Sequence, residues 1–403
     1  MSLKKHGIQS EIFEVRQSNY YKGGNIALAP NALRVLDHIG IFDSIRTKGF
    51  NYEELAFSNG SGQTLGQFFN GSQKIYDYRA LRIHRSIVRG TLVEELERQG
   101  IPIKYGKKCL GVKSEGQESA VVEFEGGETV EAEFVIGCDG IHSTIRPFLA
   151  PNTTPEFSGL MGVMGCVDRS ELESLRNGHS LHLPNMLFGS NGAFAIMPSS
   201  FDGDEIGYFA TIQEQDKGRD GWAHLENDKS TLHKVLDDRF WPETYGWPDL
   251  VKELCKKTPE GTLTSWPFYS VPHLDTWASP KKRVLLIGDA AHAIPPTGGQ
   301  GAAQAFEDAE TLGYVLFRVF ANDFKPDTLS EMITKWEEHR FARIAKVIDF
   351  TTKNGDMRKS SNHFYEQAAK EWLIWVTFKF MGPEGGAHWL YAYNAESVLG
   401  ALA

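Results

Sequence analysis

The stretch RVLLIGDAAHAIPPTGGQG, residues 283–301, decides the fold of this chain. Its apolar start, Arg283 to Gly288, predicts a buried parallel strand, and Asp289 follows at the carboxyl end of that strand. A Pro-Pro turn and three glycines then lead into an amphipathic helix that we expect from about Gln300 to Phe320. Backbone N–H groups at the start of such a helix, beside a carboxylate that can accept a hydrogen bond from a sugar hydroxyl, predict a dinucleotide site.

Size and charge restrict the function classes. The chain has 403 residues, of which 41% are hydrophobic, so it can bury a large core divided over two or three domains. Its formal net charge is -10 at pH 7, and no Lys/Arg cluster interrupts this acidic balance. Such a surface does not attract a phosphate backbone, so we expect no nucleic-acid partner.

The four cysteines, Cys109, Cys138, Cys166 and Cys255, lie far apart and form neither a CxxC motif nor a Cys/His pairing. This spacing indicates no metal site and no disulfide framework, and it favours a reducing, cytoplasmic setting. No stretch approaches the ~18 uninterrupted apolar residues of a membrane-spanning helix. We therefore expect no transmembrane segment.

The N-terminal third predicts alternating helices and strands that continue into a hairpin around Gly126-Gly127. Its expected elements are, in order, a strand over Ile8–Val15, helices over Ala29–Ile45 and Ser86–Gln99, a hairpin of Ala120–Phe124 with Thr129–Phe134, and a strand over Phe134–Gly140. The last strand ends in Asp-Gly, and Glu14 lies near the end of the first. This pattern is typical of a Rossmann-like nucleotide-binding unit.

The chain changes character between about residues 155 and 270, where short β-like runs are separated by Gly, Pro and Asn. We predict a mostly antiparallel β-sheet domain there, inserted into the nucleotide-binding domain and carrying the substrate pocket. The nucleotide-binding domain then consists of residues 1–154 and 271–350, and residues 351–403 form a helical, aromatic-rich C-terminal segment. The fold class is therefore α/β.

Two more motifs add to the predicted dinucleotide site. The segment CDGIHSTIR, residues 138–146, ends a strand in Asp139-Gly140 and closes with Ser143 and Arg146. The segment IHR places Arg85 just before a helix, where its planar fork can meet phosphate oxygens. The structural alternatives are an Asp-Gly turn with a Ser143 helix cap, and a solvated arginine at a helix start.

Together these motifs resemble the class A flavoprotein monooxygenases, which include aromatic-ring hydroxylases such as salicylate hydroxylase. The resemblance covers Ile8 to about Phe350. It implies that Asp289 holds the ribityl chain of FAD, that residues 298–301 lie against the isoalloxazine ring, and that Arg85 reaches the flavin and its pyrophosphate. The residues that it places at the cofactor are Glu14, Arg16, Gly23, Gly24, Arg85, Asp139, Asp289, Pro296, Gly299 and Gly301.

Some of these positions resemble particular parts of the cofactor site of the family. Glu14 resembles the acid that binds the adenosine ribose, and residues 21–31 resemble the loop that follows it. Asp139 belongs to the Asp-Gly motif implicated in contacts to flavin and nicotinamide. His292 lies within the 283–301 motif, and we expect it to have a structural role. The C-terminal aromatic residues predict core packing or a pocket wall.

The resemblance implies a FAD-dependent monooxygenase that uses NAD(P)H and O₂. Such an enzyme inserts one oxygen atom into a small organic substrate, here aromatic or secondary-metabolite-like. The cofactor performs the chemistry while the protein orients and shields it. No residue is assigned a catalytic role at this point.

The glycine-rich phosphate loop of the family does not occur near the N-terminus, and counting back ~20 residues from Glu14 places it before Met1. We therefore expect the first strand and its loop to be absent from residues 1–154 and FAD binding to be weakened. One alternative is a cofactor-free pseudo-monooxygenase that acts as a cyclase or isomerase, or that binds a ligand. Another is a flavoprotein oxidase or dehydrogenase without oxygen transfer.

Overall fold

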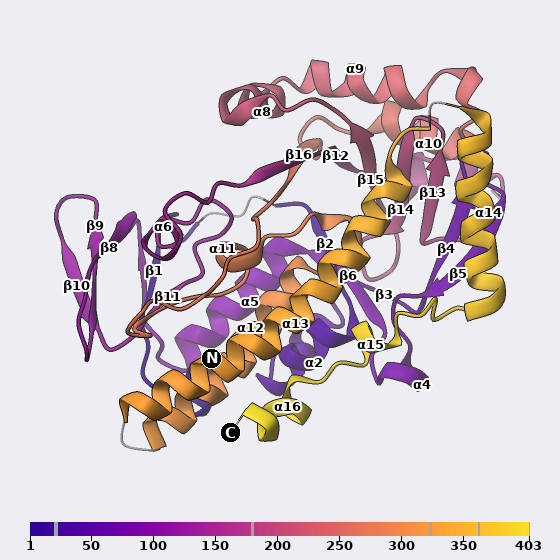
Figure 1. Ribbon diagram of the computed structural model, residues 1–403. Coiled ribbons are helices and arrows are strands. Elements are labelled where there is room, and N and C mark those ends of the chain that lie inside the picture. Colours follow the sequence, from indigo (N-terminus) through magenta and orange to yellow (C-terminus); the bar gives the residue numbers. More distant parts are fainter. Residues whose placement is uncertain (20–22, 179–180, 322–324, 362, 403) are drawn as a thin grey trace.

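The computed structural model of the protein (Figure 1) describes residues 1–19, 23–178, 181–321, 325–361 and 363–402. Tyr21 and Lys22 of the predicted 21–31 loop lie outside these ranges. The described residues combine parallel strand pairs, a large mixed sheet and C-terminal helices, which confirms the predicted α/β fold class. None of the helices in the described part of the chain has the length and apolar character required to cross a membrane.

Four short parallel strands form the part of the molecule for which the sequence predicts nucleotide binding. β1 (Ile12–Glu14) pairs with β7 (Ile103–Tyr105), and β11 (Val135–Gly137) pairs with β17 (Val284–Leu286). Among the described residues these are two separate two-stranded sheets. All three residues of β17 are fully buried, as expected for a strand covered on both faces. The strand predicted over residues 8–15 is shorter than expected, because β1 covers only residues 12–14.

Antiparallel strands extend this part of the molecule. β6 (Ala80–His84) lies between β2 (Asn25–Leu28) and β3 (Phe50–Tyr52). The predicted hairpin is confirmed by β9 (Ala120–Phe124) and β10 (Thr129–Ala132), and β8 (Cys109–Glu115) adds a third strand. Its turn contains Gly126 and Gly127 with φ of +91° and +84°, values that glycine adopts without strain.

A seven-stranded sheet contains the strands of the segment 155–270, for which the sequence predicts a mostly antiparallel sheet. Its strands, in spatial order, are β16 (Thr264–Ser270), β12 (Glu156–Asp168), β15 (Glu205–Gln213), β14 (Gly192–Pro198), β13 (Asn185–Gly189), β4 (Glu54–Asn59) and β5 (Thr64–Phe69). All neighbouring pairs are antiparallel except β13 with β4. The sheet thus extends beyond the predicted segment 155–270, because β4 and β5 come from the N-terminal third. The division into domains stays a prediction.

Three helices cover one face of this sheet (Figure 1). They are α8 (Gly218–Asn227), α9 (Lys229–Phe240) and α10 (Asp249–Lys257). The sequence analysis predicted only β structure in this region. The helices form because their apolar residues, such as Leu232, Leu236 and Phe240 on α9, recur at helical spacing and are fully buried against the sheet.

Two long helices lie side by side at the centre of the molecule (Figure 1). α12 (Gly301–Ala321) confirms the predicted helix and buries Leu312, Val315, Leu316 and Val319 at helical spacing. α13 (Pro326–Arg358) has 33 residues and runs through the domain boundary predicted at residue 350.

The remaining helices are shorter, and α5 (Arg85–Arg98) confirms the predicted 86–99 helix. The helix predicted over residues 29–45 is divided into α2 (Pro30–His38) and α3 (Phe42–Ile45), with Gly40 at φ +82° between them. The others are α1 (Ser2–Lys5), α4 (Gln73–Tyr76), α6 (Arg146–Leu149), α7 (Glu173–Arg176), α11 (Asp289–His292), α14 (Phe364–Met381), α15 (His388–Tyr391) and α16 (Ala395–Val398), with 3-10 turns η1 (Arg169–Glu171), η2 (Glu243–Tyr245), η3 (Pro296–Gly298) and η4 (Leu399–Leu402).

The C-terminal aromatic residues divide into a buried group and an exposed group. Phe378 of α14 packs against Phe57 of β4, and Tyr391 is buried. Trp372 and Trp375 are instead 63% and 46% exposed, so the prediction of core packing is wrong for them. The reason is that α14 contacts the sheet with only one face, which carries Ile374 and Phe378.

A buried ion network connects α12 and α13. Arg340 of α13 is fully buried and donates from Nε to Asp308 Oδ1 and from Nη1 to Glu307 Oε2, both at 2.7 Å. Arg343, one turn later, donates from Nη2 to Glu307 Oε1 at 3.0 Å. Asn31 of α2 donates to the same Glu307 oxygen at 2.8 Å. The network thus fixes the consecutive helices α12 and α13 to each other and to α2, which is distant from them in the sequence.

The network also reaches the 283–301 motif. Asp308 Oδ2 accepts hydrogen bonds from the backbone N–H of Gly288, at 2.8 Å, and from His292 Nε2, at 2.6 Å. Burial disfavours the charge of Asp308, but His292 and Arg340 outweigh it and lower the pKa of this carboxyl group to about 2. His292 thus has the structural role that the sequence predicts.

Replacing Arg340 with Met should lower the free energy of unfolding by about 3–5 kcal/mol, because Glu307 and Asp308 would keep buried charges without their shared partner. Denaturant titration followed by circular dichroism measures this change. Lys353→Ala is the control, since its pair with Asp349 is exposed and contributes little. An Arg340→Met variant as stable as the Lys353→Ala variant would contradict the central role of the network.

Candidate functional site

Asp289 and Gly301 lie next to each other at the ends of two elements. Asp289 begins α11 just after β17 and is exposed, whereas the next residues, Ala290 and Ala291, are buried. Gly301 begins α12, and a Cβ atom at this position would lie 3.9 Å from Asp289 Oδ1. The carboxylate therefore stands beside the free N–H groups of a long helix, which is the arrangement that the sequence predicts.

The loop between these elements is held from behind by α13. Thr297 Oγ1 donates to the Thr351 carbonyl at 2.8 Å, and Arg358 Nη2 donates to the Thr297 carbonyl at 2.7 Å. A Cβ atom at Gly298 would overlap the Thr351 side chain, so only glycine permits this approach. These contacts hold η3 against α13, and Gly299, which follows it, has φ +64°.

Arg85 faces this motif from the other side. Its backbone N–H donates to the Gly24 carbonyl at 3.1 Å, and Gly23 has φ +147°. The Arg85 guanidinium is accessible to solvent and lies over the Trp266 ring, 4.9 Å from the ring centre. Desolvation lowers its pKa, and the charge of Asp289 opposes this effect.

The pKa of Asp289 responds in the complementary way. Desolvation raises it, while the positive charges of His292 and Arg85 lower it. Asp289 and Arg85 therefore influence each other's pKa electrostatically, although they share no hydrogen bond. Gly23, Gly24, Arg85, Asp289, Pro296, Gly299 and Gly301 belong to this single constellation of backbone turns and opposite charges.

Asp139 has a local partner. Its Oδ2 atom accepts a hydrogen bond from the Thr144 backbone N–H at 2.7 Å, which closes a turn. Ser143 Oγ accepts from the Arg146 backbone N–H at 2.9 Å, and Arg146 Nη1 donates to the Ala290 carbonyl at 3.0 Å. Arg146 thus attaches the Asp-Gly motif to Ala290, the residue that follows Asp289. The contacts of Asp139 and Ser143 agree with the alternative of an Asp-Gly turn followed by a Ser143 helix cap.

Glu14 and Arg16 lie at the end of β1. Glu14 is partly buried and accepts a hydrogen bond from the Arg16 backbone N–H at 2.8 Å. Desolvation and the charges of Asp139 and Glu14 raise the pKa of the Cys138 thiol, which follows β11. The carboxyl ends of β1 and β11 therefore lie near each other.

The sequence analysis missed the residues that support the site from α13 and β16. Thr351 and Arg358 hold the 296–298 loop, and Trp266 lies under Arg85. They are far from the motifs in the sequence, and single threonine, arginine and tryptophan residues carry no spacing signal. Asn31, at the end of the predicted 21–31 loop, donates to Gln300 Oε1 at 3.0 Å, a contact that the sequence does not indicate.

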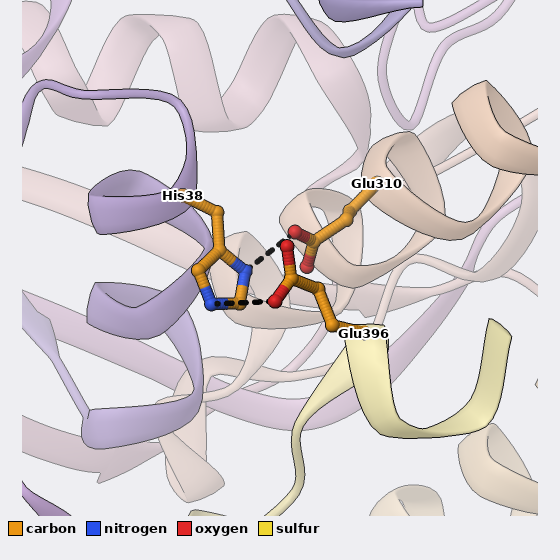
Figure 2. A group of neighbouring side chains, drawn as sticks. All are labelled: His38, Glu310 and Glu396. Atoms are coloured by element: carbon orange, nitrogen blue, oxygen red, sulfur yellow. Dashed lines mark hydrogen bonds and ion pairs between the residues drawn. The ribbon is translucent and has the colours of Figure 1, made fainter.

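A separate group of possible metal ligands lies near α16 (Figure 2). His38 Nδ1 is 2.6 Å from Glu310 Oε1, and His38 Nε2 is 3.6 Å from Glu396 Oε2. The two carboxylates face different ring nitrogens, and Lys5 is 3.3 Å from Glu396. This geometry fits an ion-paired contact that attaches α16 to α2 and α12.

Comparison with known proteins identifies the family. The family model for the FAD binding domain matches residues 1–351. The chain belongs to this family. Its relatives include the salicylate hydroxylase of Pseudomonas putida, 28% identical over 87% of this chain and 80% of the relative. Another is the 3-amino-4-hydroxybenzoate 2-monooxygenase of Streptomyces cremeus, 25% identical over 86% and 80%.

The fold is also that of a solved structure, CtdE in complex with FAD and its substrate 4. The TM-score is 0.78 at 18% identity, and the match covers 99% of this chain and 93% of that chain. These findings confirm the class A flavoprotein resemblance and FAD as the predicted cofactor.

The constellation at Asp289 fits the flavin part of FAD. An accessible carboxylate can accept from ribityl hydroxyls, and glycines without side chains keep the backbone of the 298–301 segment open to a flat ring. The guanidinium of Arg85 has the geometry to donate to phosphate oxygens.

We predict that Asp289→Ala lowers FAD affinity about tenfold to a hundredfold, because a charge-assisted hydrogen bond contributes about 1.5–3 kcal/mol. The Kd is measured by titrating FAD with the protein and following the flavin fluorescence. Asp238→Ala provides the comparison, since that residue is exposed on α9 and pairs with Lys234. Equal Kd values for the two variants would refute the role of Asp289.

Proposed function

We propose that the protein is a FAD- and NAD(P)H-dependent monooxygenase that inserts one oxygen atom from O₂ into a small aromatic or related organic molecule. The observation that carries this proposal is the position of accessible Asp289 and Arg85 on either side of the glycine turn that begins α12. The names of the relatives, a salicylate hydroxylase and an aminohydroxybenzoate monooxygenase, support it. The four free cysteines support a cytoplasmic location.

Bound FAD supplies the reduction of O₂ and the transfer of oxygen. The chain itself orients and shields. Asp289 would accept hydrogen bonds from ribityl hydroxyls, and the N-terminus of α12 at Gly301 would favour negative charge near the ring. Because α13 fixes Thr297 through two hydrogen bonds, this orientation needs no rearrangement of the loop.

The face of the seven-stranded sheet opposite α8, α9 and α10 would shield the reaction from water. Phe209 and Phe268 stack there with ring centres 5.8 Å apart. A Cβ atom at Gly24 would lie 3.6 Å from Met164 Sδ, so this face directly adjoins the Gly24 turn. Apolar and aromatic side chains next to the flavin position favour an apolar, aromatic substrate.

We predict that product formed under ¹⁸O₂ carries one labelled oxygen atom and requires NADH or NADPH. The assay uses FAD-loaded protein, a panel of hydroxybenzoates that includes salicylate, and mass spectrometry of the products. Asp289→Ala in the same assay should lose activity together with FAD. Product formed without O₂, flavin and nicotinamide would instead support a cofactor-free cyclase or isomerase. Incorporation of oxygen from labelled water, and not from labelled O₂, would exclude oxygen transfer.

The separation of the parallel strands into two pairs affects how FAD can be bound. β1 and β11 each have one strand partner among the described residues, and their carboxyl ends are close enough for Glu14 to affect Cys138. We propose that a strand and glycine-rich loop not contained in residues 1–403 pair with these free edges. Such a loop would provide the N–H groups that bind the pyrophosphate.

Accordingly, residues 1–403 alone should bind FAD weakly, and a version preceded by a strand, glycine loop and helix encoded upstream should bind it tightly. Equilibrium dialysis compares the two. The control carries the same added segment with valine in place of its loop glycines, which should restore the strand but not the affinity. Tight, stoichiometric FAD binding by residues 1–403 would contradict this proposal.

A further inference from the structure

Buried arginines in the described part of the chain differ in their partners. Arg340 and Arg343 pair with Glu307, and Arg34 donates to three backbone carbonyls. Arg358, the last residue of α13, is 8% exposed and makes one hydrogen bond, from Nη2 to the Thr297 carbonyl. Its Nε atom is buried without a partner among the described residues.

This lack of a counter-charge is unusual for an interior group. Desolvation lowers the pKa of Arg358 to about 10, and no acid among the described residues opposes this effect. A guanidinium in such a place is costly for the folded protein unless an anion joins it. Interior charges without a structural partner are therefore candidates for ligand contacts.

The position of Arg358 connects it with the flavin-facing loop. It holds Thr297, the middle residue of the 296–298 turn. One turn earlier on α13, a Cβ atom at Gly355 would lie 3.5 Å from Thr297 Oγ1 and 3.9 Å from Leu160 Cδ1. Arg358 thus lies where the loop, α13 and the sheet strand β12 meet.

A cavity of about 620 Å³ that is open to solvent lies beyond the C-terminal end of α13. It is lined by Gln213, Glu214, Gln215, Lys217, Arg239 and Ser360. Arg358 itself is not among the residues that line it. Ser360 is two residues beyond Arg358, and Gln213 is the strand partner of Leu160. Lys217 pairs with Glu214 at 3.3 Å, which leaves Arg239 to give the lining a net positive charge. The cavity therefore suits the entry of an anionic molecule.

We propose that Arg358 is a specificity-determining residue that binds the carboxylate group of the substrate, and that the substrate enters through this cavity. The aromatic nature of the remainder of the substrate rests on the proposed function; the anionic group rests on Arg358 alone. The Nε–H group and the unused N–H groups of the terminal nitrogens can donate to two carboxylate oxygens, while Nη2 keeps its bond to Thr297. A neutral amide in place of the carboxylate would leave the charge uncompensated.

The test uses the purified 403-residue protein, with benzoate and its neutral analogue benzamide as probes in calorimetric titration. Arg358→Met should lower benzoate affinity at least tenfold and leave benzamide affinity unchanged. Arg82→Met is the matched control, because Arg82 is also 8% exposed and has a partnerless Nε atom, but lies on β6. Its benzoate affinity should equal that of the parent.

Thermal unfolding provides a second measurement that a purely structural arginine would not reproduce. Benzoate should raise the Tm of the parent and of Arg82→Met, but not that of Arg358→Met. If Arg358→Met does not fold, Arg358→Lys replaces it, and benzoate affinity below that of the parent with unchanged benzamide affinity supports the proposal.

Three results would overturn it: equal binding of benzoate and benzamide by the parent, unchanged benzoate binding by the folded Arg358 variant, or loss of binding in Arg82→Met only. Because neither probe assay requires FAD, NAD(P)H or turnover, a failure here is distinguishable from a failure of the monooxygenase proposal.

Discussion

The contact on which the structure depends is the placement of Arg340 between Glu307 and Asp308. Three charges without access to water are stable only while all are present, so α12 and α13 have one permitted relative position. Asp308 carries this constraint to the turn after β17 through Gly288 and His292. The orientation of Asp289, one residue beyond Gly288, thus depends on a charge network that supports the site from the interior.

The site itself consists mostly of backbone. Gly298 permits a close approach of the loop to Thr351, and hydrogen bonds from α13 hold the 296–298 turn. Such an arrangement can bind a large cofactor with few charged groups, because N–H groups and a helix terminus contribute where side chains are absent.

The sequence predicts those parts of the fold and site that depend on local pattern. The buried strand β17, the helix α12 and the Gly126-Gly127 hairpin follow from periodicity and turn chemistry, and Asp289 and Arg85 follow from motifs. The ion network was not predictable, because Glu307 and Arg340 are ordinary helix residues until the tertiary fold buries them. The helices α8 to α10 were missed where glycine and proline concealed short amphipathic runs, and the pairing of β4 with β13 has no local signal.

The joining of β4 and β5 to the large sheet has a consequence for how such a protein can evolve. The sheet contains strands separated by more than a hundred positions, and the parallel contact of Glu54–Asn59 with Asn185–Gly189 continues it across that separation. Residues 155–270 therefore do not form an exchangeable cassette: a recombination event that replaced them would have to supply a strand compatible with an edge encoded elsewhere. New substrate preferences in this architecture should arise by substitution within the sheet more readily than by exchange of the whole segment.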